Sequence, residues 1–175
     1  MQDAFTMLQL PRRPWLEESG VRSAFQQAAA RMHPDVASGS AADFSELTKA
    51  YQTLREPASR VRHLLTLESP KMVLPGGAPA ELMSLFPVIA AARQNLGRAT
   101  QDSDATALRN EASGAGTQLQ QAMDAALREL RELDAAWPSE AALNALPKLQ
   151  ARLTFLGKWQ TQLREALLRL DIGAV

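Results

Sequence analysis

The sequence predicts an all-α protein, and three observations support this class. Aromatic residues make up only 5% of the 175 residues, whereas a β-sandwich or barrel would need many β-branched and aromatic side chains. Apolar residues recur every three or four positions over long stretches, which is typical of amphipathic helices. Proline and glycine cluster at residues 70–79, a segment that cannot continue a helix. We therefore expect two helical domains, 1–69 and 80–175, joined by a linker at 70–79.

Four helices are expected in the first domain. A short opening helix around Ala4–Gln9 ends before Pro11. Two longer helices follow, and each carries an apolar stripe. The first stripe is Val21, Phe25, Ala28 and Met32, and the second is Phe44, Leu47, Tyr51 and Leu54. The first long helix ends at His33, because Pro34 disfavours helical backbone in the residue before it. A short last helix follows Pro57, and the two long helices are expected to form an antiparallel hairpin.

Three helices are expected in the second domain, because three apolar seams have heptad-like spacing. The seam residues are Leu82, Leu85, Ile89, Ala92 and Leu96, then Leu119, Met123, Leu127, Leu130 and Leu133, and finally Leu146, Leu149, Leu153, Leu156, Leu163, Leu167 and Leu170. Gly114 and Gly116 are expected to weaken or bend the middle helix. The run Trp137–Glu140 supplies a turn and an N-cap for the last helix. Narrow seams and short connections favour an antiparallel bundle.

The composition excludes several kinds of chemistry. The 19 Lys and Arg residues balance 19 Asp and Glu residues, so the charge gives no sign of a nucleic-acid or anionic-membrane partner. The chain has no cysteine and only two histidines, which excludes disulfides, thiolate zinc sites and iron–sulfur ligation and leaves few routes to another metal. No phosphate-binding loop, GxSxG or HExxH motif occurs. We therefore expect no catalytic residues, metal or cofactor, and a protein that is not an enzyme.

The N-terminus indicates a cytoplasmic protein. Asp3 stands near the start, and no apolar run of signal-peptide length follows it. No segment approaches the roughly eighteen consecutive apolar residues that a transmembrane helix needs.

The tripeptide His33-Pro34-Asp35 lies in the expected loop between the two long helices. So short a motif is weak evidence by itself, because a turn whose His and Asp side chains hydrogen-bond locally would look the same. Its surroundings are more specific. Together with the runs Phe5–Pro11 and Lys49–Arg60, it makes the segment Phe5–Leu65 resemble a J-domain, the module that engages ATP-driven chaperones of the DnaK type. Both runs resemble the HscB branch of that family in particular.

The resemblance implies a chaperone-docking site. In the family, the loop and the basic face of the helix before it dock on the chaperone's nucleotide-binding domain and trigger ATP hydrolysis. The residues implied here are His33, Pro34, Asp35, Arg31 and Arg22. Asp35 would offer its carboxylate to an arginine of the chaperone. Since J-domains usually carry more basic residues before the motif than Arg22 and Arg31, docking should depend less on salt than is usual.

The C-terminal bundle of HscB-like proteins binds the iron–sulfur scaffold protein, and Leu82–Phe86 and Ala151–Lys158 resemble parts of that bundle. With Leu82 and Leu153 on the seam, the heptad phase places other large apolar residues off it, where they would be exposed. The implied client-binding residues are Leu82, Met83, Phe86 and Phe155. In the alternative arrangement, Phe155 packs with Trp159 on the middle helix or on the J-domain.

The resemblance therefore implies a co-chaperone that stimulates the ATPase of a DnaK/HscA-type chaperone and delivers an IscU-type scaffold protein to it. Acidic residues of the family's first bundle helix are absent here, which makes this face more apolar and leaves the identity of the client open. Their stretch reads Pro87, Val88, Ala90 and Ala91. Two alternatives remain: a bundle that binds another client or self-associates, and a purely structural helical adaptor. His63 is expected to be structural or exposed.

Overall fold

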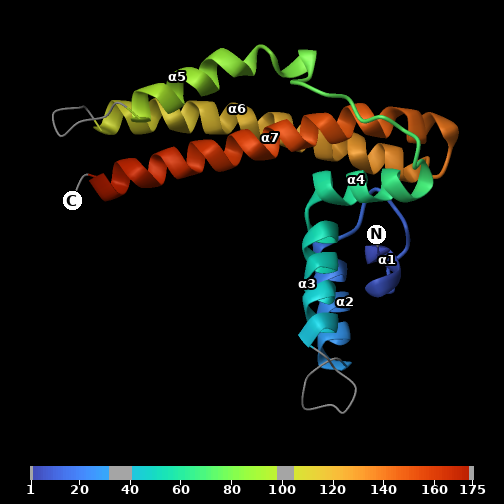
Figure 1. Ribbon diagram of the computed structural model, residues 1–175. Helices are drawn as coiled ribbons and strands as arrows, with labels where there is room; N and C mark the ends of the chain where they lie inside the picture. Colours follow the sequence, from blue (N-terminus) through green and yellow to red (C-terminus); the bar gives the residue numbers. More distant parts are fainter. Residues whose placement is uncertain (1, 32–40, 98–104, 174–175) are drawn as a thin grey trace. The chain divides into compact units, whose positions relative to one another are not determined.

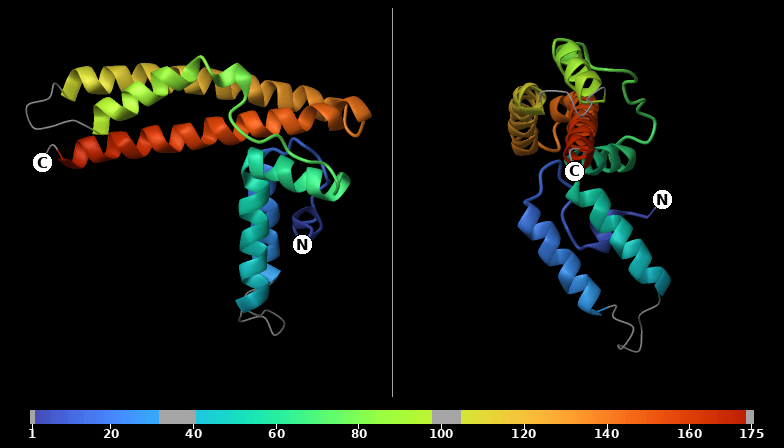
Figure 2. Two further views of the ribbon diagram at one scale, coloured as in Figure 1. Left: turned by 45° about the horizontal axis from the view of Figure 1, so that its top comes forward. Right: turned by 90° about the vertical axis from the view of Figure 1, so that its left-hand side faces the viewer.

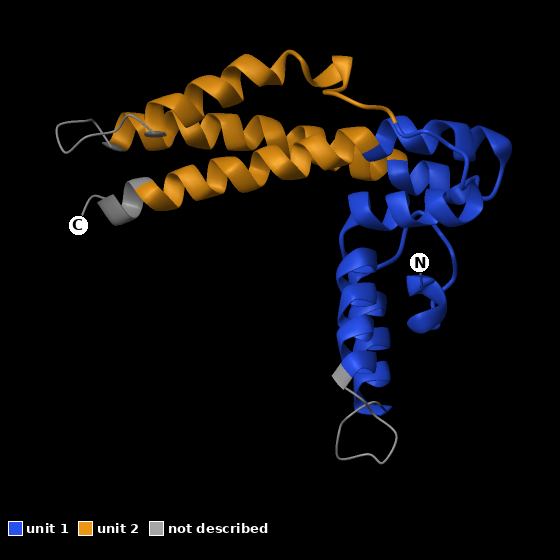
Figure 3. Cartoon of the chain, in the orientation of Figure 1, with its two compact units in different colours: residues 1–74, 130–150 blue, residues 75–129, 151–175 orange. Residues whose placement is uncertain are grey.

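The computed structural model describes residues 2–31, 41–97 and 105–173 (Figure 1). These ranges contain seven α-helices, one short 3₁₀ helix and no strand, which confirms the all-α prediction. The chain divides into two compact units (Figure 3): residues 1–74 with 130–150 form unit 1, and residues 75–129 with 151–175 form unit 2. None of the helices in the described ranges combines the length and apolar composition that a membrane span requires.

Unit 1 begins with the four predicted helices, which are α1 (Ala4–Met7), α2 (Glu18–Arg31), α3 (Ala41–Arg55) and α4 (Pro57–Glu68). Helices α2 and α3 pack side by side as an antiparallel hairpin, and α1 packs on α3 (Figures 1 and 2). The largest buried side chains here are Phe5, Val21, Leu47, Leu54 and Leu64. The predicted stripe is wrong at Phe44, which is 43% exposed. This residue lies in the first turn of α3, at the end of the hairpin remote from α4 (Figure 1).

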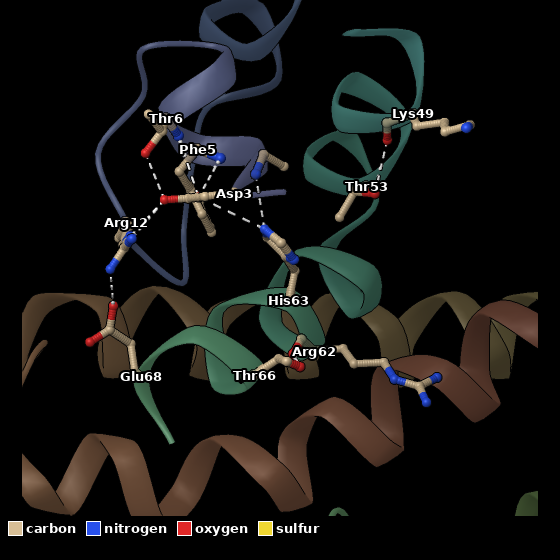
Figure 4. Close-up of polar contacts among 11 residues, drawn as sticks. Asp3, Phe5, Thr6, Arg12, Lys49, Thr53, Arg62, His63, Thr66 and Glu68 are labelled. Atoms are coloured by element: carbon tan, nitrogen blue, oxygen red, sulfur yellow. Dashed lines mark hydrogen bonds and ion pairs between the residues drawn. The ribbon is translucent and has the colours of Figure 1, made fainter. Parts of the chain in front are cut away.

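Side chains of Asp3 and His63 hold the N-terminus of helix α1 in place (Figure 4). The carboxylate of Asp3 caps it, accepting hydrogen bonds from the backbone N–H of Phe5 at 3.0 Å and from the guanidinium of Arg12 at 2.7 Å. The backbone N–H of Ala4 donates to Nε2 of His63 at 3.0 Å, and the His63 ring stacks on Phe5. His63 is buried on α4. It is therefore a structural histidine, which is one of the two expected alternatives.

The segment before α2 is bonded to residues around the end of α6 (Ala105–Ala135). The carboxylate of Asp134 accepts hydrogen bonds from Nε and Nη2 of Arg13, at 3.1 and 2.7 Å, and from the backbone N–H of Trp15 at 3.1 Å. The indole Nε1 of Trp137 donates to the carbonyl oxygen of Arg12 at 3.0 Å. These bonds explain why residues 130–150 belong to unit 1.

The compact units therefore differ from the predicted domains, 1–69 and 80–175. Apolar spacing continues unchanged past Leu130, so the pattern contains no sign that the neighbours of the helix change there. The predicted N-cap at the start of α7 (Glu140–Gly173) is confirmed, because Oγ of Ser139 accepts from the backbone N–H of Ala142 at 3.2 Å.

Unit 2 contains η1 (Ala80–Leu82), α5 (Leu85–Gly97) and the parts of α6 and α7 that lie in residues 105–129 and 151–173. Figure 2 shows the three long helices side by side, with α5 and α7 running in one direction and α6 in the other. The three-helix antiparallel bundle is thus confirmed. Its core includes Leu82, Ile89, Leu96, Leu119, Leu153, Leu156 and Leu163. Helix α6 runs through Gly114 and Gly116 without interruption.

Acid should destabilise the protein through His63. Burial lowers the pKa of His63 below its usual 6.5, Asp3 raises it and Arg12 lowers it further. Because the unfolded chain binds this proton more readily, stability is full above pH 6.5 and falls as the pH drops below about 6.5. Urea denaturation between about pH 7.5 and pH 5 should show this fall.

The matched control is His63→Gln, whose side-chain oxygen can still accept from Ala4 but does not titrate. An equal fall in this variant would show that another group is responsible.

Asp3 titrates at lower pH than His63. Burial raises the pKa of Asp3, but hydrogen bonds from Thr6 and Arg12 outweigh this and bring it to about 2. Its contribution is therefore present above the ordinary value of 3.8 and lost only as the pH falls toward 2.

Removing the Asp134 carboxylate should lower the stability of unit 1. Asp134→Ala leaves the N–H of Trp15 without its acceptor and leaves Arg13 only the backbone carbonyl oxygen of residue 134, and we expect a loss of about 1–3 kcal/mol in the free energy of unfolding. The control is Asp124→Ala on the same helix, where an exposed carboxylate accepts only from Gln120. That change should stay within about 0.5 kcal/mol. Equal losses in the two variants would contradict a special role for Asp134.

Candidate functional site

The helical hairpin of unit 1 carries the first candidate site. Of the predicted residues, His33, Pro34 and Asp35 lie outside the described residues. Arg31 is the last residue of α2 and is exposed, so it directly adjoins the tripeptide's segment. Arg22 is exposed as well and forms an ion pair with Glu18 at 2.7 Å.

Arg22 and Arg31 do not form one basic face. Nine residues advance an α-helix by about two and a half turns, at roughly 3.6 residues per turn, so the two side chains leave α2 in opposite directions. Between these directions runs the buried stripe of Val21 and Ala28. The structure therefore separates the two arginines that the resemblance places in one docking site, and only Arg31 lies next to the tripeptide's segment.

Packing between α2 and α3 holds together the two helices that precede and follow residues 32–40 in the sequence. The rings of Phe25 and Tyr51 stack with centroids 4.4 Å apart, and Leu47 and Ala50 are buried between the helices. On the outer side of α3, Lys49 pairs with Glu46 at 2.6 Å. The hairpin is thus a packed support for the segment that contains His33, Pro34 and Asp35.

The start of α5 in unit 2 carries the second candidate site. Met83 is 52% exposed and Phe86 is 51% exposed, which confirms their predicted positions off the seam. Leu82 is only 5% exposed and belongs to the core of unit 2, so it does not contribute to an exposed surface. Phe155 on α7 is half-buried and not fully exposed as expected. We call Met83, Phe86 and Phe155 the apolar patch.

Trp159 joins the two helices beneath the apolar patch, and its role is not evident in the heptad pattern. Trp159 is 6% exposed, and its ring centroid lies 6.3 Å from that of Phe86 and 6.1 Å from that of Phe155. The signal in the sequence is the spacing of Phe155 and Trp159, four positions apart on one helix, which places their side chains together. The alternative contact of Phe155 with Trp159 is thus present, and it includes Phe86 of α5.

Charge is sparse on the α5 side of the apolar patch, whereas Arg152 and Lys158 lie three positions before and after Phe155 on α7. Residues 80–97 contain one acid and one base, Glu81 and Arg93. Further along α5, Asn95 donates to the carboxylate of Glu111 at 2.9 Å. In the part of the chain that the structure describes, no group of three or more His, Asp or Glu residues could hold a metal ion. The arrangement is suited to bind a protein through apolar contact.

Comparison with known proteins identifies what the N-terminal part of the chain resembles. Residues 3–63 match the family model of the DnaJ domain. A co-chaperone protein HscB homolog from Chromobacterium violaceum is 39% identical over 74 residues, which make up 38% of this chain and 42% of that protein. The match thus spans less than half the length of this curated relative.

Two solved structures share the fold over nearly the whole chain. Chaperone HscB from Vibrio cholerae has a TM-score of 0.70 at 20% identity, covering 97% of this chain and 99% of that one. Human co-chaperone protein HscB has a TM-score of 0.59 at 16% identity, covering 94% of this chain and 82% of that one. Residues 3–63 therefore match a DnaJ domain, and the fold of the chain is similar to that of the two HscB structures over nearly its whole length.

Proposed function

We propose that this protein is a co-chaperone that stimulates the ATPase of a DnaK/HscA-type chaperone and delivers an IscU-type iron–sulfur scaffold protein to it. The observation that carries the proposal is a DnaJ domain with His33-Pro34-Asp35 between its paired helices, on the same chain as an exposed apolar patch. The protein is not itself an enzyme in this proposal. It changes the rate of a reaction on its partner, in the cytoplasm and without a cofactor.

The chaperone docks at the segment that α2 and α3 support. His33 and Asp35 supply polar side chains there, and Pro34 restricts the backbone of the residue before it. Asp35 offers a carboxylate for a charge-assisted hydrogen bond with an arginine of the chaperone. Arg31 adds a positive charge beside them. Arg22 points away from Arg31 and contributes little to the same contact.

The scaffold protein binds the apolar patch. Large apolar side chains at a protein surface are a signal of protein binding. Met83 and Phe86 are exposed here, and Phe155 is partly exposed. Because the side chains of the patch are apolar, the binding energy comes mainly from apolar burial. Two alternatives are a different client for the bundle and self-association through the same patch.

Substitutions in the tripeptide should abolish ATPase stimulation without unfolding the protein. We expect His33→Gln and Asp35→Asn to lose stimulation of a cognate chaperone in steady-state ATPase assays. Stability should change by less than about 0.5 kcal/mol, as is usual for exposed sites. Normal stimulation by either variant would refute the docking proposal and favour a structural adaptor.

The two arginines of α2 provide a sharper comparison. Arg31→Gln should raise the concentration for half-maximal ATPase stimulation by about threefold to tenfold, because it removes a charge at the edge of the contact. Arg22→Gln should raise it by less than about twofold. Both substitutions remove one exposed charge from the same helix, so each is a control for the other. Equal effects would show that docking covers both sides of α2.

Truncating the patch should weaken scaffold binding. Phe155→Ala is expected to raise the dissociation constant for an IscU-type protein about thirtyfold, because an aromatic anchor commonly contributes about 2 kcal/mol or more. The melting temperature should move little, whereas loss of a core Phe side chain would cost about 3–5 kcal/mol. Isothermal titration calorimetry and thermal denaturation measure the two quantities.

The control for this prediction is Leu168→Ala, which removes an exposed apolar residue elsewhere on α7. It should leave scaffold affinity unchanged. If Phe155→Ala strongly lowers stability while affinity per folded molecule stays the same, Phe155 is a core residue and the proposed patch is wrong. If the wild-type protein binds no IscU-type scaffold but forms dimers that Phe155→Ala dissociates, the patch serves self-association.

A further inference from the structure

We propose that Trp159 is the positioning residue of the apolar patch, holding Phe86 and Phe155 in the arrangement that the scaffold protein binds. This inference rests on the proposed function, because it assigns how the client surface is built. Trp159 itself is buried and is not expected to touch the client.

The ring contacts of Trp159 connect two helices through one side chain. Phe86 lies on α5, whereas Phe155 and Trp159 lie on α7. The Trp159 ring is tilted by 52° to that of Phe86 and by 76° to that of Phe155, with centroids 6.3 and 6.1 Å apart. Offset, tilted and edge-to-face pairs at this separation are favourable beyond their buried area. One buried ring therefore restrains both rings of the patch.

Exposure decreases in steps across this cluster. Phe86 is half-exposed, Phe155 is half-buried and Trp159 is buried. An exposed phenylalanine on a helix surface would otherwise sample several rotamers, and a client would have to order it on binding. A ring that is already restrained loses less conformational entropy when the client binds, and this increases affinity without any new contact to the client. The large indole is suited to this role because it reaches both rings at once.

A purely structural role makes a different prediction. Leu163 lies four residues further along α7 and is also buried. Both side chains fill the interior of unit 2, but the aromatic contacts to the patch belong to Trp159. If Trp159 were only a core residue, shortening it would lower stability and leave the affinity of the folded protein unchanged, as shortening Leu163 should.

The test is a double-mutant cycle on the full chain, with affinity for a purified IscU-type scaffold measured by isothermal titration calorimetry. Trp159→Leu should weaken binding about tenfold and Phe155→Ala about thirtyfold. If the two effects were independent, the double variant would bind the scaffold about three hundredfold more weakly than wild type. If the two residues act through one arrangement, the loss of affinity should stay below about a hundredfold. Trp159→Phe, which retains a ring and avoids the largest loss of volume, should remain within about threefold of wild type.

Leu163→Ala is the control: it should lower the melting temperature and leave affinity within about twofold of wild type. Two results would overturn the inference while leaving the proposed function intact. These are an unchanged affinity of Trp159→Leu per folded molecule, and multiplication of the two single effects in the double variant. Absence of scaffold binding by the wild-type protein would instead remove the proposed client, and the inference with it.

Discussion

The arrangement of unit 1 depends on the hydrogen bonds of one buried guanidinium group, that of Arg60. It donates from Nε to the carbonyl oxygen of Pro14 at 2.9 Å and from Nη1 to that of Leu54 at 2.7 Å. Burial lowers its pKa to about 10, so it remains a cation at neutral pH, and a buried cation must keep its hydrogen-bond partners to avoid a large desolvation cost. Since Pro14 precedes α2 and Leu54 lies near the end of α3, one side chain fixes both chain ends of the hairpin. The centre of the Trp15 ring lies 5.9 Å from Cζ of Arg60 and 4.2 Å from Cζ of Arg131. The ring therefore connects Arg60 to residues 130–150.

Helical spacing predicts much of this structure, because it reports which side of a helix is apolar. It placed Met83 and Phe86 off the seam, and both are exposed. Spacing does not report which neighbour covers an apolar side, so it missed that residues 130–150 join unit 1. The partners that decide this assignment, such as Arg13 and Asp134, are polar and more than a hundred residues apart in sequence. No local pattern contains such a contact.

The same limit explains the two sites. The tripeptide and its flanking runs imply the docking segment through their resemblance to J-domains. A count of basic residues on α2 does not reveal that Arg22 and Arg31 point in opposite directions, but the helical turn of about 3.6 residues does. In unit 2, heptad phase separates exposed from buried positions one helix at a time. Trp159 escapes that scheme because its importance lies in touching Phe86 across two helices. The unpredicted part of the apolar patch is thus the part that depends on a second helix.

The two sites use different physics, and this suits the proposed function. In that proposal, docking at His33 and Asp35 relies on charge-assisted contacts, whereas the patch around Phe86 relies mainly on apolar burial. If both proposed sites act as described, their location on one chain brings a bound scaffold to the chaperone at a raised effective concentration. Any coupling between the two binding events must be reciprocal, since the change in chaperone affinity caused by the scaffold equals the change in scaffold affinity caused by the chaperone. A preformed patch favours this delivery, because the client then binds without reordering the surface, and release can be left to the chaperone's own cycle.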